Sequence, residues 1–204
     1  MILLLVLAIS IVIAIVRGGK LSRLASLPLR WPALPLLAFA LQIVVIYFPS
    51  SGGQGLSSLH TAMLVGSYLI LLLAIWMNRR LPGMAFIALG LLLNLAVMLA
   101  NGGYMPITPD TVQRIGHGDH VVVTGTTARV GHSKDVVLPK EQTHLWFLSD
   151  VFPLPPPFPL PSAFSLGDVF TAVGGFLIVQ RALLGPASPR ARSQPGPVPP
   201  SNGT

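Results

Sequence analysis

Two carboxyl groups in the C-terminal half of the chain, those of Asp150 and Asp168, are of a type and spacing that could do acid–base chemistry. They are two of only six acidic residues among 204. Two carboxyl groups that share a proton can activate water, because one acts as the base while the other acts as the acid. Asp150 and Asp168 are therefore candidate catalytic residues of a hydrolase, on condition that folding brings them together.

The surroundings of the two aspartates differ. Asp150 lies near the aromatic residues Trp146 and Phe152, and a carboxyl group in apolar surroundings at a membrane surface is expected to have a raised pKa. Asp168 follows Ser165 by three residues and comes just before an apolar run, which is the pattern of a capping box at a helix N-terminus. A role as a helix cap is the simpler interpretation of Asp168.

The segment between the two aspartates is rich in proline. Proline fixes φ and has no N–H, so the pattern predicts an extended, polyproline-like strut rather than a helix or a paired strand. A change of direction at Ser162 and Ala163 would bring Asp150 within hydrogen-bonding reach of Asp168 or of the turn at residues 101–103. The six prolines are Pro153, Pro155, Pro156, Pro157, Pro159 and Pro161.

The composition of the chain is that of an integral membrane protein. Hydrophobic residues make up 52% of the chain and charged residues only 9%, whereas soluble domains have about 25% charged residues. The mean hydropathy is +0.72. The chain has no cysteine, which excludes disulfides and thiol catalysis.

The apolar segments predict an all-α membrane domain of residues 1–184 with five transmembrane helices. Within the fourth segment, Asn94 is expected to bond to a neighbouring helix rather than to a substrate. Residues 185–204 contain no apolar periodicity and are predicted to be a disordered cytoplasmic tail. The expected spans cover about residues 1–18, 31–48, 59–77, 81–100 and 164–184.

The distribution of charge predicts the orientation. Nine cations and no acidic residue follow the first, third and fifth segments, and the positive-inside rule places them in the cytoplasm. The N-terminus is then outside, in a bacterial inner membrane. The net charge of +7 is explained by topology and by attraction to anionic lipid rather than by nucleic acid. The expected partners are the lipid bilayer and other membrane proteins.

The segment 101–163, rich in Gly and Pro, is predicted to be an extracytoplasmic loop. Thr108 looks like an N-cap with Pro109 at the first helical position, and Gly116 is a plausible end of that short helix. Residues 120–124 and 128–130 have the pattern of a small hairpin. Because about sixty residues with this much Gly and Pro are too few to form an independent core, we expect a loop that rests on the ends of the helices.

All five histidines lie in the predicted outer segments. The run His117-Gly118-Asp119-His120 contains side chains that bind metals. It lies in a glycine-broken loop without a helix face to aim the ligands, so solvated loop histidines are the better interpretation. We expect no metal site and no cofactor.

Four short motifs stand out along the chain, namely Asn101-Gly102-Gly103-Tyr104-Met105-Pro106, Ser133-Lys134-Asp135, Leu148-Ser149-Asp150 and Ser165-Leu166-Gly167-Asp168. Together they resemble a family of bacterial membrane proteins catalogued as domain of unknown function 5317. The resemblance implies a bacterial inner-membrane protein and brings no known activity, cofactor or catalytic residue. It adds a set of candidate functional residues, and also includes the final Gln180-Arg181 and the basic run after the first helix. The candidates are Asn101, Gly102, Gly103, Met105 and Pro106, then Ser133 and Lys134, and finally Ser165 and Gly167 beside Asp168.

A second, local similarity is to lipoprotein signal peptidases, whose last helix begins with Phe-Asn-x-Ala-Asp. Phe164, Asp168 and Gly174 match that helix, while Ser165 replaces the Asn and Gly167 replaces the Ala. The block that carries the other aspartate of that family is absent here. The similarity implies a membrane-surface aspartic hydrolase that uses Asp150 and Asp168.

Three functions are compatible with these patterns. The first is a non-enzymatic scaffold, partner-binding or sensing component of the membrane. The second is the aspartic hydrolase. The third is a transporter of a neutral or lipid-like cargo. Proton-coupled pumps require ionisable side chains within the membrane, and none lies in the middle of a predicted span.

Overall fold

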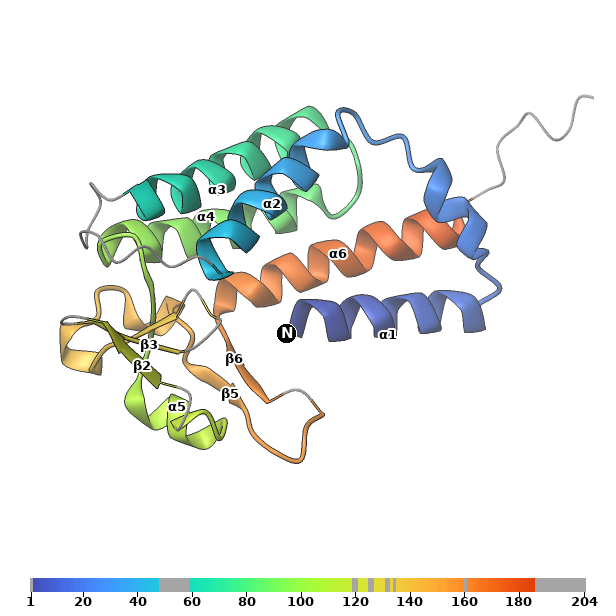
Figure 1. Ribbon diagram of the computed structural model, residues 1–204. Helices are drawn as coiled ribbons and strands as arrows, with labels where there is room; N and C mark the ends of the chain where they lie inside the picture. Colours follow the sequence, from blue (N-terminus) through green and yellow to red (C-terminus); the bar gives the residue numbers. More distant parts are fainter. Residues whose placement is uncertain are drawn as a thin grey trace, which may run out of the picture.

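The computed structural model describes residues 2–47, 59–118, 121–124, 127–130, 133, 135–159 and 161–185. The predicted tail lies outside these ranges beyond residue 185. Helices predominate in the described chain, and each predicted span contains one (Figure 1). They are α1 (Ile2–Val16), α2 (Ala33–Tyr47), α3 (Leu59–Met77), α4 (Met84–Ala100) and α6 (Leu166–Leu184).

Among the described residues, α6 is the helix long and apolar enough to cross a membrane, with 19 residues and a mean hydropathy of 1.4. The other apolar stretches whose residues are fully described are shorter, including the part Thr61–Met77 of α3. The remaining three are Ile2–Val16, Ala33–Tyr47 and Met84–Ala100. At about 1.5 Å per residue, a helix of 15 residues such as α1 spans roughly 22 Å. The observed helices are therefore shorter than several of the predicted spans.

Helix α6 packs against α1 on one side and α4 on the other, while α2 packs on α3 (Figure 1). Polar side chains join α1 to α6. The Gln180 amide donates to the backbone oxygen of Ser10 at 2.7 Å and to its hydroxyl at 3.1 Å. Arg17 donates to the Gln180 side-chain oxygen at 3.1 Å. Ser10 also bonds to Phe176, and Lys20, later in the chain, bonds to Leu183, so α1 and α6 run in the same direction.

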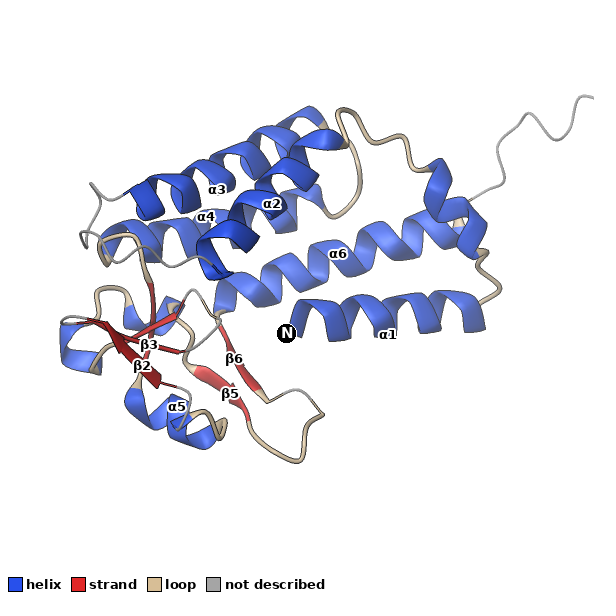
Figure 2. Cartoon of the chain, viewed as in Figure 1, coloured by secondary structure: helices blue, strands red, loops and turns tan. Residues whose placement is uncertain are grey.

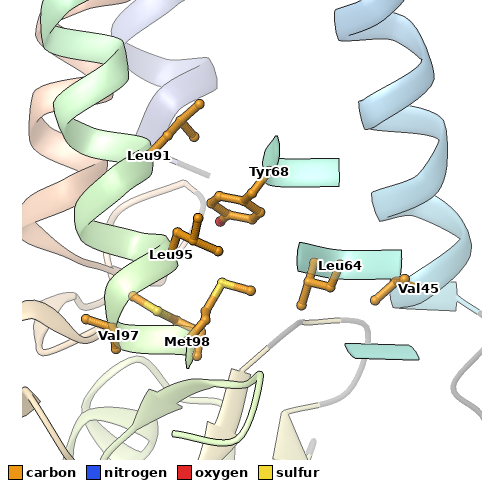
Figure 3. Close-up of a cluster of buried hydrophobic side chains, with 8 residues drawn as sticks. Val45, Leu64, Tyr68, Leu91, Leu95, Val97 and Met98 are labelled. Atoms are coloured by element: carbon orange, nitrogen blue, oxygen red, sulfur yellow. The ribbon is translucent and has the colours of Figure 1, made fainter. Parts of the chain in front are cut away.

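A cluster of buried apolar side chains fills the space between α2, α3 and α4 (Figure 3). Tyr68 of α3 lies beside Leu91 and Leu95 of α4 in this view. Met105, which follows α4, also belongs to the cluster and is fully buried. The segment that leaves α4 is thus packed into the base of the helical part.

The prediction of an all-α chain is wrong, because residues 101–164, which we call the cap, contain strands (Figure 2). Four strands form one sheet in the order β1-β4-β3-β2, with β1 parallel to β4 and the other pairs antiparallel. Two further strands, β5 and β6, form an antiparallel pair. The bounds are β1 (Met105–Ile107), β2 (Val121–Thr124), β3 (Thr127–Val130), β4 (Asp135–Val137), β5 (Phe152–Leu154) and β6 (Ser162–Phe164).

Short helices complete the cap, and one of them confirms a prediction. Helix α5 (Pro109–Arg114) has Thr108 as its N-cap, whose hydroxyl accepts from the Thr111 amide at 3.3 Å. Pro109 is at the first helical position, and Gly116 follows with a φ of 72°. The predicted hairpin is also present as β2 and β3. Among the described residues of the cap, 3₁₀ helices include η3 (Lys140–Gln142) and η4 (Trp146–Leu148).

The cap has a small apolar cluster of its own, which the sequence interpretation missed. Ile107, Val112, Ile115 and Val130 come together from β1, α5 and β3. Val121 of β2, Val137 of β4 and Ala163 of β6 pack against this cluster, so residues far apart in the segment contribute to it. The cap also rests on the helix ends as expected, since β1 and η4 contact α4.

The proline-rich segment is not a strut. Phe152 pairs with Phe164, Pro153 with Ala163 and Leu154 with Ser162, and the rings of Phe152 and Phe164 stack with centroids 5.4 Å apart. A two-stranded ribbon consists entirely of edge strands, which tolerate a proline such as Pro153. The chain therefore leaves Asp150, turns within the prolines and comes back to the start of α6.

Candidate functional site

The capping box at the start of α6 is confirmed. The Ser165 hydroxyl accepts from the Asp168 amide at 3.1 Å, and the Asp168 Oδ2 atom accepts from the Ser165 amide at 3.1 Å. Ser165 is fully buried. Two N–H groups that have no partner within the helix are satisfied in this way, and the Asp168 carboxylate is held at the positive end of α6.

Asn94 of α4 closes this capping box from the neighbouring helix. Its amide nitrogen donates to the Asp168 Oδ1 atom at 3.0 Å, and its oxygen accepts from the Ser165 hydroxyl at 2.9 Å. Asn94 is only 2% exposed. The expectation that Asn94 bonds to a neighbouring helix is confirmed, and its partners are two of the candidate site residues.

Glycines allow α4 and α6 to approach closely enough for this network. A Cβ atom on Gly167 would overlap the Asn94 side chain, and one on Gly90 would overlap the Gly167 backbone oxygen and the Thr171 hydroxyl. A Cβ atom on Gly174 would lie 2.5 Å from the Gly83 backbone oxygen. The pairs Gly90–Gly167 and Gly83–Gly174 show that the two helices run antiparallel, with small residues at the contact.

Asn101 ties the cap to the end of α4. Its side-chain nitrogen donates to the backbone oxygens of Val97 and His144, each at 2.8 Å. Its side-chain oxygen accepts from the His144 amide at 2.9 Å. The amide of Asn101 thus bonds to both backbone groups of His144, as a neighbouring strand would, and holds the segment before η4 against the helix.

The predicted sharp exit from α4 is confirmed at Gly102 and Gly103, which have φ values of 70° and 93°. The Gly103 amide donates to the Met98 oxygen at 2.7 Å. A Cβ atom on Gly103 would overlap the side chain of Thr61 on α3. Both the backbone conformation and the space therefore require glycine at residue 103.

Met105 and Pro106 lie in β1, directly beneath the helices. Pro106 is almost completely buried, like Met105. The Pro106 oxygen accepts from the Asp150 amide at 3.2 Å, so the chain around Asp150 returns to the strand that follows the glycine turn. Asp150 is 3% exposed and Ser149 is fully buried.

The prediction that Asp150 lies beside Asp168 or beside the turn at residues 101–103 stays a prediction at the level of side chains. The backbone bond of Asp150 goes to Pro106, three residues beyond the turn. The Asp168 carboxylate is bonded to Ser165 and Asn94. The structure thus shows a role for Asp168 in joining helices, and brings Asp150 to β1.

Ser133 lies in the connection between β3 and β4. Its hydroxyl donates to the Asp135 Oδ2 atom at 2.6 Å and accepts from the Asp135 amide at 3.2 Å. Asp135 is opposite Met105 in the parallel pairing of β4 with β1. Lys134 lies outside the described residues, as do Asp119 and His120 of the histidine-containing run.

Most of the candidate residues therefore lie where the helices meet the cap, and we call this region the joint. Its contacts are those of Asn94 with Ser165 and Asp168, of Asn101 with His144, and of Pro106 with Asp150. Sequence reasoning did not find that Asn94 belongs to this joint, nor the pairing of Asn101 with His144 or of Gly103 with Thr61. A signal existed for Asn94, because a single strongly polar residue in an apolar helix needs a partner. Nothing in the sequence indicates His144 or Thr61.

Comparison with known proteins supports the family assignment. The model of a family of unknown function (DUF5317) matches residues 26–180. These residues include the whole joint but neither α1 nor the basic run at residues 17–22. No curated protein and no solved structure matches the chain. The chain therefore belongs to the family of unknown function DUF5317.

Proposed function

We propose that this chain is a multi-pass protein of a bacterial inner membrane, with α1, α2, α3, α4 and α6 as its five spans. Large apolar side chains point outward on all of these helices, an arrangement that water disfavours and lipid favours. The short helices favour a locally thin bilayer. Examples of such side chains, each more than half exposed, are Leu4, Val12, Leu36, Phe39, Leu69 and Leu92.

The charges support an orientation with the cap outside. No acidic residue precedes Asp110 or follows Asp168. All six acidic residues therefore belong to the cap or to the first turn of α6, while the cations at residues 17–30, 79–80 and 181 flank the opposite ends of the helices. This asymmetry favours a cytoplasmic location for the basic ends.

Cysteine labelling tests this orientation, because the natural chain has no cysteine. We expect Gln113→Cys, on an exposed residue of α5, to react with a membrane-impermeant maleimide on intact spheroplasts. We expect Ser22→Cys, on the exposed connection after α1, to react only after lysis. Labelling of Ser22→Cys and protection of Gln113→Cys in intact spheroplasts would reverse the proposed topology.

We propose that the protein acts as a scaffold that presents the cap to a partner outside the membrane. The observation that carries this proposal is the use of the family-like residues at the joint. Asp168 accepts one bond from Asn94 and another from Ser165, and Asn101 clamps His144. Groups engaged in this way position one part of the molecule on another, whereas a catalytic acid must exchange its proton with water.

Exposed apolar side chains of the cap lie at the edge of its larger sheet. Val122 and Val123 of β2 are 55% and 69% exposed, and β2 is the last strand of the sheet order. An edge strand with exposed apolar side chains is a surface that favours contact with another protein. We therefore place the partner contact of the scaffold at this strand.

In-cell photocrosslinking tests the scaffold function. A photoreactive amino acid at residue 123 is expected to give a specific covalent adduct of higher mass, because this side chain points away from the cap. The same amino acid at Val136, which is 3% exposed, serves as the control and should give none. If residue 123 gives no adduct in cells that express the protein at its natural level, the scaffold proposal is wrong for this surface.

A further inference from the structure

A compact group of arginines and tryptophans lies where the chain enters α2 and leaves α3. The side chain of Asn78, at the end of α3, joins the two segments. Its oxygen accepts from the Arg30 amide at 2.8 Å, and its nitrogen donates to the Arg30 oxygen at 3.0 Å and to the Ala74 oxygen at 2.8 Å. Asn78 is 6% exposed, so its buried side chain fixes the position of the Arg30 backbone relative to the end of α3.

The residues on either side of the Asn78–Arg30 junction are charged or aromatic and point outward. Trp31 and Trp76 are each 65% exposed. The guanidinium carbon of Arg79 lies 4.6 Å from the centroid of the Trp76 ring, a cation–π contact that holds the arginine on the aromatic face. We call this group the Arg–Trp cluster, and its members are Arg30, Trp31, Trp76, Arg79 and Arg80.

The Arg–Trp cluster differs from other cations at the same end of the helices, although its Arg79 also donates to the Trp76 backbone oxygen at 3.1 Å. Arg23 donates to the backbone oxygens of Leu183 and Gly185, and Arg17 donates to Gln180. Those two arginines satisfy the end of α6. The ion pair between Arg114 and Asp110, in the cap, is the one recorded in the described part of the chain, so no described carboxylate neutralises the three arginines of the cluster.

We propose that the Arg–Trp cluster binds the headgroup of an anionic phospholipid in the inner leaflet. The guanidinium groups match a phosphate in geometry and charge, and can bind it through paired hydrogen bonds. Exposed tryptophans prefer the level of the headgroups, where the ring is in the apolar layer and the indole N–H meets polar groups. The exposed apolar faces of α2 and α3 continue directly from the cluster, so a lipid held there would place its chains along these helices.

This inference rests on the proposed membrane location and adds a lipid class to it. The test uses the full chain purified in detergent, with the headgroup supplied as short-chain phosphatidylglycerol, short-chain phosphatidylcholine or inorganic phosphate. Retained lipid is counted by native mass spectrometry. We expect phosphatidylglycerol to be retained at least about fivefold more than phosphatidylcholine. Each cation near an anionic surface contributes about 1 kcal/mol of attraction, which corresponds to about fivefold in the binding constant. Competition by inorganic phosphate alone would instead assign a soluble anion.

Two double variants of equal net charge distinguish a specific lipid site from general attraction of anionic lipid to the basic ends of the helices. Arg79→Gln/Arg80→Gln removes two cations of the cluster, and Lys20→Gln/Arg181→Gln removes two exposed cations from the same end of the helices. We expect the first to abolish the preference for phosphatidylglycerol and the second to keep it. Equal losses in both would overturn the proposal, as would a parent protein without any preference.

A second measurement remains available if the first variant does not fold. In a Trp146→Phe background the two tryptophans left are Trp31 and Trp76, and brominated phosphatidylglycerol should quench their fluorescence more strongly than brominated phosphatidylcholine. Equal quenching by the two lipids would count against the site. Failure of the membrane topology would appear separately, in the cysteine labelling of intact spheroplasts.

Discussion

Replacing Gly174 with alanine is expected to lower the free energy of unfolding by about 1–3 kcal/mol, the range for overpacking a tight contact. The added Cβ atom would lie 2.5 Å from the Gly83 oxygen and 2.9 Å from the Ile87 amide nitrogen. Both are backbone atoms of the α4 segment, so the helices must move apart. The measurement is denaturation in mixed detergent micelles, followed by far-UV circular dichroism.

The next residue in the chain supplies the matched control. A Cβ atom on Gly175 would meet no atom within 4 Å, so Gly175→Ala changes the same helix by the same group without the steric conflict. Because alanine is a better helix former than glycine by about 1 kcal/mol, this variant should be neutral or more stable. Equal destabilisation by both variants would show that the loss of stability does not come from the contact between α4 and α6.

The apolar helices could be predicted because their signal is local. Long runs without charge are compatible with little else than buried or lipid-facing helices, and Gly102 and Gly103 mark the turn after the fourth of them. The ends were less predictable. The structure starts α2 at Ala33 and ends it at Tyr47, inside the predicted range. Before the start, the Arg30 backbone is bonded to Asn78 and Trp31 has a φ of 55°, outside the right-handed helical region.

The cap could be predicted only where its structure depends on neighbouring residues. Thr108 and Pro109 define a helix start within a few positions, and the paired strands β2 and β3 are neighbours in the chain. The parallel pairing of β1 with β4 joins Met105 to Asp135 across a long segment, and no local pattern specifies it. The proline-rich strands were missed for a related reason, since their pairing depends on the stacked rings of Phe152 and Phe164.

For the candidate site, the sequence identifies residues but not their connections. The capping box at Ser165 and Asp168 is a local pattern and was predicted correctly. That Asn94 completes it depends on which face of α4 meets α6, and this is determined by the positions of Gly90 and Gly167. The side-chain relation between Asp150 and Asp168 depends on the turn of the β5–β6 ribbon, which composition does not determine.

Replacing Asn94 with alanine is expected to cost about 1.5–3 kcal/mol, the value of a hydrogen bond to a charged group. The substitution removes the donor to the Asp168 Oδ1 atom and the acceptor of the Ser165 hydroxyl. A neutral pair provides the comparison. Gln42 donates to the Ser67 hydroxyl at 3.2 Å between α2 and α3, and Gln42→Ala should cost only about 0.6 kcal/mol, the average for polar contacts between membrane helices.

An exchange of the two side chains tests the role of Asp168 most directly. Asn94→Asp alone places two carboxylates where one bond of 3.0 Å existed, and their repulsion should destabilise the protein more than Asn94→Ala does. The double variant Asn94→Asp/Asp168→Asn restores the network, because the amide of residue 168 then donates to residue 94 while its oxygen still accepts from the Ser165 amide. A joint between helices and cap predicts recovery of stability and of the cross-link at residue 123. Loss of the cross-link in a double variant of restored stability would instead show that the Asp168 carboxylate is needed for more than joining the helices.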